Sequence, residues 1–150
     1  APPMGDFWLD TAADTPVVLI SAGVGITPMM AMLDALLQAG QPRPVQFLHA
    51  CRSPSVQAFG THLANLAAEY PQLQLTVWYE QADRLPTHGA VASQLGRMQL
   101  TAANVLPDAH YYLCGPLAFM QAQQASLLAL GVPAANLHAE AFGTGGNGLG

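Results

Sequence analysis

Residues 17–28 read Val-Val-Leu-Ile-Ser-Ala-Gly-Val-Gly-Ile-Thr-Pro, an apolar run followed by two glycines and a Thr-Pro pair. A short continuous apolar run is typical of a strand in a parallel sheet, because helices cover both faces of such a strand. The glycines permit a tight turn, Thr27 suits the N-cap of a helix, and Pro28 suits its first position. Apolar residues then recur at helical spacing until Gly40. The stretch therefore predicts a strand, a glycine-rich turn and a helix.

The same succession recurs along the chain, and this recurrence predicts the fold. Strands are expected at Val17–Ser21, Val45–Cys51, Leu73–Tyr79, Tyr111–Cys114 and Leu137–Phe142. Their alternation with helices indicates the α/β class: a doubly wound five-stranded parallel sheet in the order 3-2-1-4-5, with helices on both faces. Ligands of such sheets bind beyond the carboxyl ends of the strands where the order reverses, here between the first and fourth strands.

The segments between these strands complete the prediction. Helices are expected from Ser55 to Tyr70 and over Pro116–Leu130. Gln81–Ala92 reads as a loop, and a short helix is expected near Ser93–Met98. The chain length fits one domain of this class.

The composition excludes several classes of protein. Of the 150 residues, 51% are hydrophobic and 9% are charged, which is unlike a disordered chain. The net charge is -5 and the chain has no lysine, so nucleic acid is not an expected partner. The uncharged stretches Thr15–Leu33 and Ala109–Ala139 are interrupted by glycine and proline, so no membrane span is expected. Two cysteines and the lack of a basic leader favour a cytoplasmic protein.

Two glycine-containing turns form the first candidate site. Ala22–Pro28 follows the first strand, Cys114-Gly115-Pro116 follows the fourth, and each leads into a helix. Because these strands are neighbours in the expected order, both turns flank one crevice. Glycine backbone and helix N-termini together suit a pyrophosphate, although G-x-G-x-x-P differs from the dinucleotide fingerprint G-x-G-x-x-G. A tight turn without a ligand is the alternative.

Cys114 has two interpretations of its own. It is either a small buried thiol or a nucleophile, with His138 on the neighbouring strand as its base. The N-terminus of the following helix is expected to lower the pKa of Cys114. The second interpretation would make the protein a Cys-dependent hydrolase or thiol enzyme.

The ends of the second and fifth strands supply further candidates. Arg52 and Ser53 lie where the adenosine ribose of a dinucleotide is expected, and no Asp or Glu occurs between Cys51 and Glu69. A carboxylate there favours NAD and an arginine can accept the 2′-phosphate of NADP, so Arg52 indicates NADP or is simply solvated. Glu140-Ala141-Phe142-Gly143 ends the fifth strand. The remaining histidines lack metal-ligand spacing, so no metal site is expected and they are predicted to be structural: His49, His62, His88 and His110.

Together, these motifs resemble the ferredoxin–NADP reductase superfamily. Three of them stand in that family's order: Ala22-Gly23-Val24-Gly25-Ile26-Thr27-Pro28, Tyr112-Leu113-Cys114-Gly115-Pro116 and Glu140-Ala141-Phe142-Gly143. Gly5-Asp6-Phe7-Trp8-Leu9 resembles the closing strand of the family's FAD-binding barrel. Further stretches are similar to the reductase part of bacterial flavohaemoglobins: Pro16–Ser21, Leu48-His49-Ala50, Trp78-Tyr79 and Tyr111–Gln121.

The resemblance implies an NAD(P)-binding domain that delivers hydride from NAD(P)H to FAD. It implies catalytic contributions from Cys114, which helps to place the nicotinamide, and from Glu140 and Phe142, which face the flavin. The cofactor-binding residues implied by the resemblance and by the expected fold are Ala22, Gly23, Val24, Gly25, Ile26, Thr27, Pro28, Arg52, Ser53, Gly115, Pro116, Ala141, Gly143 and Thr144. In flavohaemoglobins the flavin passes electrons to haem, which converts nitric oxide and oxygen to nitrate, so a nitric oxide dioxygenase system is expected.

The resemblance also implies that the chain is part of a larger enzyme. Residues 1–10 are expected to end a missing FAD-binding barrel, residues 11–143 to form the NAD(P)-binding domain, and residues 144–150 to be a flexible tail. The barrel would share FAD with this domain, and haem would lie in a separate globin domain. Ala22, Ala90 and Thr144 depart from the family's usual Gly, Arg and Pro, which leaves NADH or NADPH open, although the subfamily favours NADH. The reductase of an oxygenase system is the alternative context.

Overall fold

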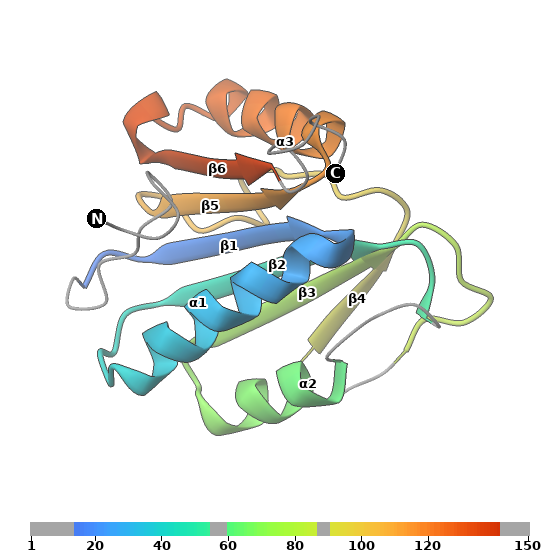
Figure 1. Ribbon diagram of the computed structural model, residues 1–150, viewed down its shortest axis with the longest axis horizontal. Helices are drawn as coiled ribbons and strands as arrows, with labels where there is room; N and C mark the ends of the chain where they lie inside the picture. Colours follow the sequence, from blue (N-terminus) through green and yellow to red (C-terminus); the bar gives the residue numbers. More distant parts are fainter. Residues whose placement is uncertain (1–13, 55–59, 87–90, 142–150) are drawn as a thin grey trace.

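The apolar run after Pro16 forms a central strand of the sheet in the computed structural model, which describes residues 14–54, 60–86 and 91–141 (Figure 1). Residues 17–20 of this strand are completely buried. Six parallel strands lie in the order β4-β3-β2-β1-β5-β6. They are β1 (Val17–Ala22), β2 (Val45–Cys51), β3 (Leu73–Tyr79), β4 (Val91–Leu95), β5 (His110–Gly115) and β6 (Leu137–Ala141).

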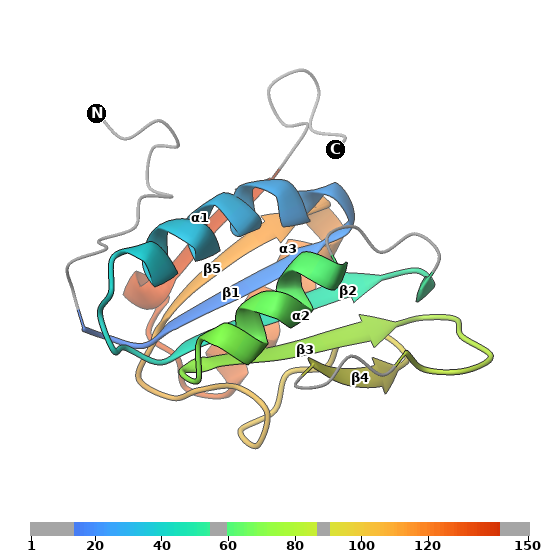
Figure 2. The same ribbon diagram turned by 90° about the horizontal axis from the view of Figure 1, so that it is seen from below.

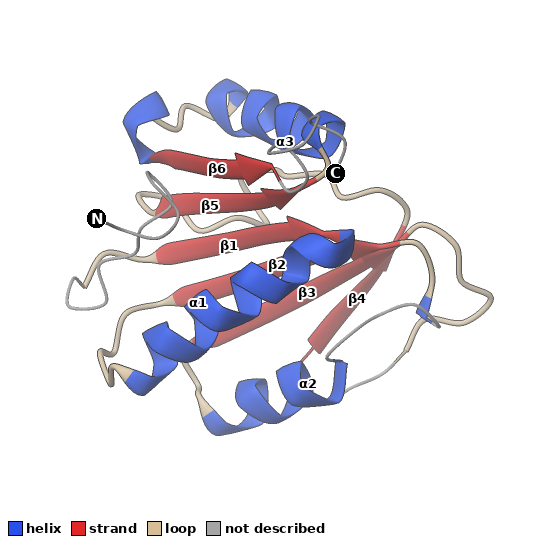
Figure 3. Cartoon of the chain, viewed as in Figure 1, coloured by secondary structure: helices blue, strands red, loops and turns tan. Residues whose placement is uncertain are grey.

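Helices cover both faces of the sheet (Figures 2 and 3). On one face, α1 (Ile26–Gln38) packs against β1 and β5, and α2 (Gly60–Glu69) packs against β3 and β4. On the other face, α3 (Leu117–Ala129) packs against β5 and β6. Successive residues of β1 enter two separate hydrophobic cores, Val17 and Leu19 on the α1 face and Val18 and Ile20 on the α3 face. This double burial explains why the strand is apolar at every position.

The strand register aligns the carboxyl ends of the three central strands. Ser21 of β1 lies opposite His49 of β2 and Cys114 of β5. One residue later, Ala22 lies opposite Ala50. The loops that follow β1, β2 and β5 therefore leave the sheet at the same edge, where doubly wound proteins bind their ligands.

The predicted fold class is confirmed, and the predicted number of strands is wrong by one. A short helix was expected near Ser93–Met98, but β4 occupies Val91–Leu95 and pairs with β3 from Leu75↔Val91 to Tyr79↔Leu95. β4 is short, and its three central residues, Ala92, Ser93 and Gln94, are small or polar and are not buried. Its local sequence pattern is therefore a weak indication of a strand. Its hydrogen bonds to β3 stabilise it as an edge strand, and such tertiary pairing overrides local propensity.

Some expectations lie outside the described residues. These are the helix cap at Ser55, the barrel strand within residues 1–10, Phe142 with Gly143, and the tail at 144–150. Within the described ranges, no helix is both long and apolar enough to cross a membrane.

Candidate functional site

The two glycine turns touch each other through their backbones. A Cβ atom built on Gly25 would lie 2.7 Å from the carbonyl carbon of Cys114 and 3.0 Å from the backbone nitrogen of Gly115. A Cβ atom built on Gly115 would lie 3.4 Å from the Cβ of Ala22. Because no side chain fits between these segments, the two turns lie against each other as predicted. Gly25 is buried, so it serves this close packing and does not contribute to the surface of the site.

The first turn begins with a left-handed residue and continues directly into α1. Gly23 has φ +58°, and residues Gly23–Gly25 form a 3-10 turn whose carbonyls at Gly23 and Val24 accept the N–H of Ile26. The helix starts at Ile26, so the prediction that Thr27 is its N-cap is wrong. Thr27 and Pro28 lie inside the first helical turn because the 3-10 turn already directs the chain along the helix axis.

Neither helix at this edge has a side-chain cap. Gly25 and Pro116 occupy the N-cap positions of α1 and α3, and neither helix carries an acidic residue in its first turn. The first N–H groups of a helix usually have no acceptor within it, and they carry the positive end of its dipole. In α1 the N–H of Ile26 is bonded to the preceding 3-10 turn and Pro28 has no N–H, so this end of α1 acts mainly through its dipole. The positive ends of two helices thus lie at the same edge of the sheet, and no acidic side chain of either first turn neutralises them.

A cavity of about 650 Å³ opens at this edge. Its lining residues come from the first glycine turn, the ends of β2 and β3, and the start of α3: Ala22, Gly23, Val24, Ile26, Thr27, His49, Ala50, Cys51, Arg52, Glu80, Pro116 and Phe119. Seven of the residues assigned from the sequence therefore share one cavity: Ala22, Gly23, Val24, Ile26, Thr27, Arg52 and Pro116. Cavities of 300–1,000 Å³ are typical of cofactor sites.

Several lining residues were not predicted. His49 was expected to be structural, which agrees with its 2% exposure and with the 2.8 Å distance between its Nδ1 and the Ser21 hydroxyl, but it also lines the cavity. Burial lowers the pKa of His49 to about 4, so the ring is neutral at pH 7. Glu80 reaches the cavity from β3, and Phe119 from α3. The signals for His49 in the sequence were its place near the end of a buried strand and the resemblance of Leu48-His49-Ala50 to the flavohaemoglobin reductase part.

Cys114 is not an activated nucleophile. It is 1% exposed and absent from the cavity lining. Burial raises its pKa to about 11, with a smaller contribution from the charge of Glu140, so the expectation of a lowered pKa is wrong. Desolvation of the thiolate outweighs the dipole of the following helix. Glu140 lies directly opposite Cys114 in the pairing of β5 with β6, so these two catalytic candidates are brought together.

The proposed base for Cys114 is engaged elsewhere. His138 lies opposite Tyr112 in the register and stacks on its ring, with 4.6 Å between centroids. Its Nε2 is 3.0 Å from Nδ1 of His110. These contacts hold the imidazole beside its cross-strand neighbours, so the structure does not support a Cys114–His138 dyad.

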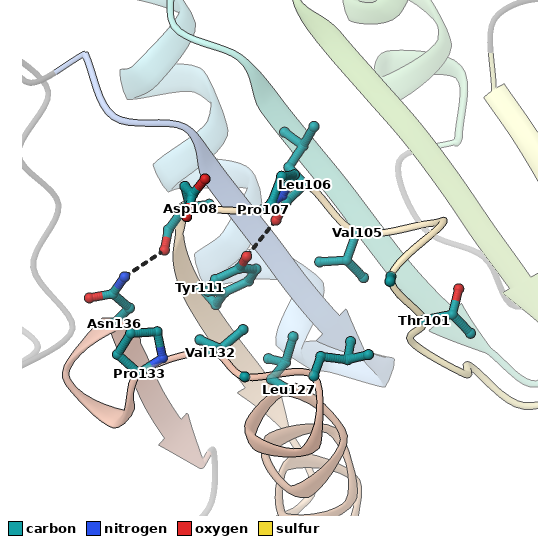
Figure 4. A pocket seen from close by; sticks show the side chains of 14 residues that line it. Thr101, Val105, Leu106, Pro107, Asp108, Tyr111, Leu127, Val132, Pro133 and Asn136 are labelled. Atoms are coloured by element: carbon teal, nitrogen blue, oxygen red, sulfur yellow. Dashed lines mark hydrogen bonds between the residues drawn. The ribbon is translucent and has the colours of Figure 1, made fainter.

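A second cavity of about 220 Å³ lies at the amino end of β5, away from the glycine turns (Figure 4). Apolar side chains such as Val105, Leu127 and Val132 line much of it. The Tyr111 hydroxyl donates to the Leu106 carbonyl, and Asn136 donates to the Ala109 carbonyl. Two of the polar side chains that line this cavity, Tyr111 and Asn136, are thus bonded to backbone carbonyls. Across the described ranges, no group of three or more His, Cys, Asp or Glu residues could hold a metal ion.

Known proteins share both the sequence and the fold. Residues 19–125 match the family model described as the oxidoreductase NAD-binding domain. Flavohemoproteins of Bordetella pertussis and Chromobacterium violaceum are 47% and 48% identical to the chain over 149 and 145 residues. These matches cover 97% and 95% of the chain but 37% and 36% of those proteins. The chain thus spans little more than a third of the length of these relatives.

Solved structures lead to the same family. The flavohem-like FAD/NAD-binding domain of a nitric oxide dioxygenase from Vibrio cholerae has a TM-score of 0.76 and 41% identity, and the match covers 90% of this chain and 53% of that one. A flavohemoglobin from Malassezia yamatoensis, with bound FAD and haem, has a TM-score of 0.76 and 26% identity, covering 93% and 34%. The resemblance to the reductase part of the flavohaemoglobins is confirmed, and the chain belongs to the oxidoreductase NAD-binding domain family.

Proposed function

We propose that the cavity at the glycine turns binds a reduced nicotinamide dinucleotide and presents it to an FAD held by a preceding barrel domain. The observation that carries this proposal is the backbone contact between Gly25 and the Cys114–Gly115 peptide. This contact brings two uncapped helix N-termini to one cavity, and such N-termini bind phosphate groups. The edge formed by the first glycine turn and the start of α3 is therefore suited to a pyrophosphate, even though the chain has no lysine.

The residues of the first glycine turn and His49 would contact the ligand without adding a negative charge next to the pyrophosphate. Thr27 is exposed at the cavity and supplies a hydroxyl, and Gly23 presents backbone without a side chain. His49 is neutral, so it can exchange hydrogen bonds with the ligand without charging the site. Pyrophosphate at Gly23–Thr27 leaves the adenosine half to extend over β2 and the nicotinamide half over β5.

The residues at the end of β5 orient the nicotinamide and do not react with it. When bound, the reduced nicotinamide supplies a hydride that the flavin accepts. Cys114 keeps its proton at neutral pH because of its burial and the neighbouring Glu140, so it packs as a neutral group and does not attack the ring. Gly115 and Pro116 border the nicotinamide, and β6 carries Glu140 and Ala141 to the same edge. Orientation is thus the contribution of the protein to hydride transfer.

We further propose that the chain functions inside a longer flavohaemoglobin-type polypeptide in the cytoplasm. Residues 11–143 would form its NAD(P)-binding domain, preceded by an FAD-binding barrel and a globin domain with haem. This proposal is supported by the share of each protein that the matches cover. Almost the whole of this chain matches, but it corresponds to little more than a third of the length of two flavohemoproteins. An open reading frame that places an iron–sulfur motif before Ala1, in place of a globin, would instead assign the chain to an oxygenase reductase.

The binding step is tested by adding a charge to the first glycine turn. Val24 is 68% exposed and lines the cavity, so Val24→Asp places a carboxylate there without altering the core. At roughly 5 Å from a doubly charged pyrophosphate in water, one carboxylate weakens binding by roughly tenfold. Isothermal titration of the 150-residue chain with NADH is expected to show this loss.

A matched variant separates the site from general effects of charge. Leu128 is 50% exposed on α3 and lies outside the cavity lining, so Leu128→Asp makes the same change and should leave the affinity for NADH within about twofold. In the amide spectrum, NADH should shift Gly23 and Gly115 and leave Gly131 unchanged. Saturating NADH that shifts neither glycine turn would refute the proposal.

A further inference from the structure

The ends of β2 and β3 bring two opposite charges to one end of the cavity. Arg52 follows β2, Glu80 follows β3, and both line the cavity. The two segments remain hydrogen-bonded beyond the strands, because the N–H of Glu80 donates to the Cys51 carbonyl at 3.1 Å and the N–H of Gln81 donates to the Arg52 carbonyl at 2.8 Å. Glu80 therefore lies next to Cys51 and Arg52 although 28 positions separate Arg52 from Glu80 in the sequence.

This end of the cavity is where the adenosine ribose is expected. In doubly wound sheets the pyrophosphate lies at the turn after the first strand, and the ribose lies beyond the end of the neighbouring strand, here β2. β3 is the next strand out, about 4.8 Å from β2. A group at the end of β3 is thus within reach of the 2′ position of that ribose.

The charges at this position decide which dinucleotide fits. Among the described residues, Arg52 and Glu80 are the only charged ones that line the cavity. No ion pair between them occurs in the part of the chain that the structure describes, so each charge acts on the ligand separately. A 2′-phosphate would be attracted by Arg52 and repelled by Glu80. Because this attraction and this repulsion oppose each other, the protein gives no net electrostatic gain that offsets the cost of removing water from the 2′-phosphate of NADPH.

We propose that Glu80 selects NADH over NADPH by opposing Arg52 at the adenosine ribose. From the sequence alone, Arg52 indicates a preference for NADP, because no carboxylate follows β2. In the folded protein β3 supplies that carboxylate from the side. The inference rests on the proposed function, since it assigns the selectivity of the same cavity.

The test compares three variants of the 150-residue chain. Replacing Glu80 with Gln removes one charge at an exposed position, so folding should be unaffected. At roughly 6 Å in water, a carboxylate and a phosphate dianion repel each other enough to change affinity about tenfold. Glu80→Gln should therefore lower the ratio of the dissociation constant for NADPH to that for NADH about tenfold. Arg52→Gln should raise the same ratio.

Glu69→Gln is the matched control. Glu69 is exposed at the end of α2 and lies outside the cavity lining, so its loss changes the net charge by the same amount and should leave the ratio within about twofold. The effect of Glu80→Gln should also shrink at high ionic strength, because salt screens exposed charges.

The outcomes distinguish this inference from the proposed function. If the unaltered chain binds neither NADH nor NADPH, the proposed function and the selectivity both fail. If NADH binds and Glu80→Gln leaves the ratio within twofold, or Glu69→Gln changes it as much, only the role of Glu80 is refuted.

Discussion

A methyl group at Gly25 tests the backbone contact on which the site depends. In Gly25→Ala the new Cβ would lie 2.7 Å from the carbonyl carbon of Cys114, whereas carbon atoms pack at about 3.5–4.0 Å. The turns must therefore separate by roughly 1 Å. Overpacking by one carbon costs about 1–3 kcal/mol, and we expect the upper end because both sides of the contact are backbone. For about 150 residues, a loss of 3 kcal/mol lowers the melting temperature by roughly 6–12 °C.

The neighbouring glycine provides the control for this experiment. A Cβ atom on Gly23 would meet nothing within 4 Å, so Gly23→Ala carries only the strain of φ +58°, about 1 kcal/mol. Its melting temperature should fall by roughly 2–4 °C. Circular dichroism during heating measures both values, and titration with NADH should show weaker binding for Gly25→Ala. A Gly25→Ala protein that melts no lower than Gly23→Ala would refute the close contact between the turns.

Two further predictions concern buried ionisable groups. The pKa of His49 is about 4 in the folded protein against 6.5 in the unfolded chain. The free energy of unfolding is therefore unaffected by this group above pH 6.5, and it falls by about 3 kcal/mol on acidification to pH 4. Urea unfolding at pH 7 and pH 4 should show a smaller loss for His49→Gln, and an equal loss would contradict the buried neutral ring. Cys51 and Cys114 have a pKa of about 11 in the folded protein against 9.0 in the unfolded chain, so the free energy of unfolding should fall as the pH rises above 9. Both thiols should also be alkylated far more slowly at pH 8 in the folded protein than in urea. A Cys114 that reacts equally fast in both states would support the nucleophile interpretation.

The sequence predicted the elements that local pattern determines. Residues 17–20 are apolar at every position because both faces of β1 are covered, and this pattern identified the central strand. The alternation of strands and helices then placed the two glycine turns beside each other, since β1 and β5 are neighbours in any sheet of this order. The meeting of Gly25 with Gly115 follows from that topology, and the structure confirms it.

Features that depend on tertiary pairing were not predictable in this way. β4 pairs with β3, and nothing in the local sequence of Val91–Leu95 indicates that partner. Glu80 reaches Arg52 only because β3 continues beside β2 past the end of both strands. The pKa of Cys114 was misjudged because the sequence shows its place before a helix, whereas the buried thiol was only one of two interpretations and its near-complete burial is a tertiary property.

The two glycines of the first turn explain how an acidic chain can bind an anionic ligand. Gly23 adopts a left-handed conformation that turns the chain toward α1, and Gly25 lets the backbone of β5 approach without an intervening side chain. This approach places the N-termini of α1 and α3 at one edge, where both lack side-chain caps. Near the glycine turns the positive potential then comes from peptide dipoles, which act within a turn of the helix end, and Arg52 adds a positive charge farther along the cavity. A net charge of -5 spread over the surface is screened beyond about 8 Å at physiological salt, so it does not cancel the local attraction.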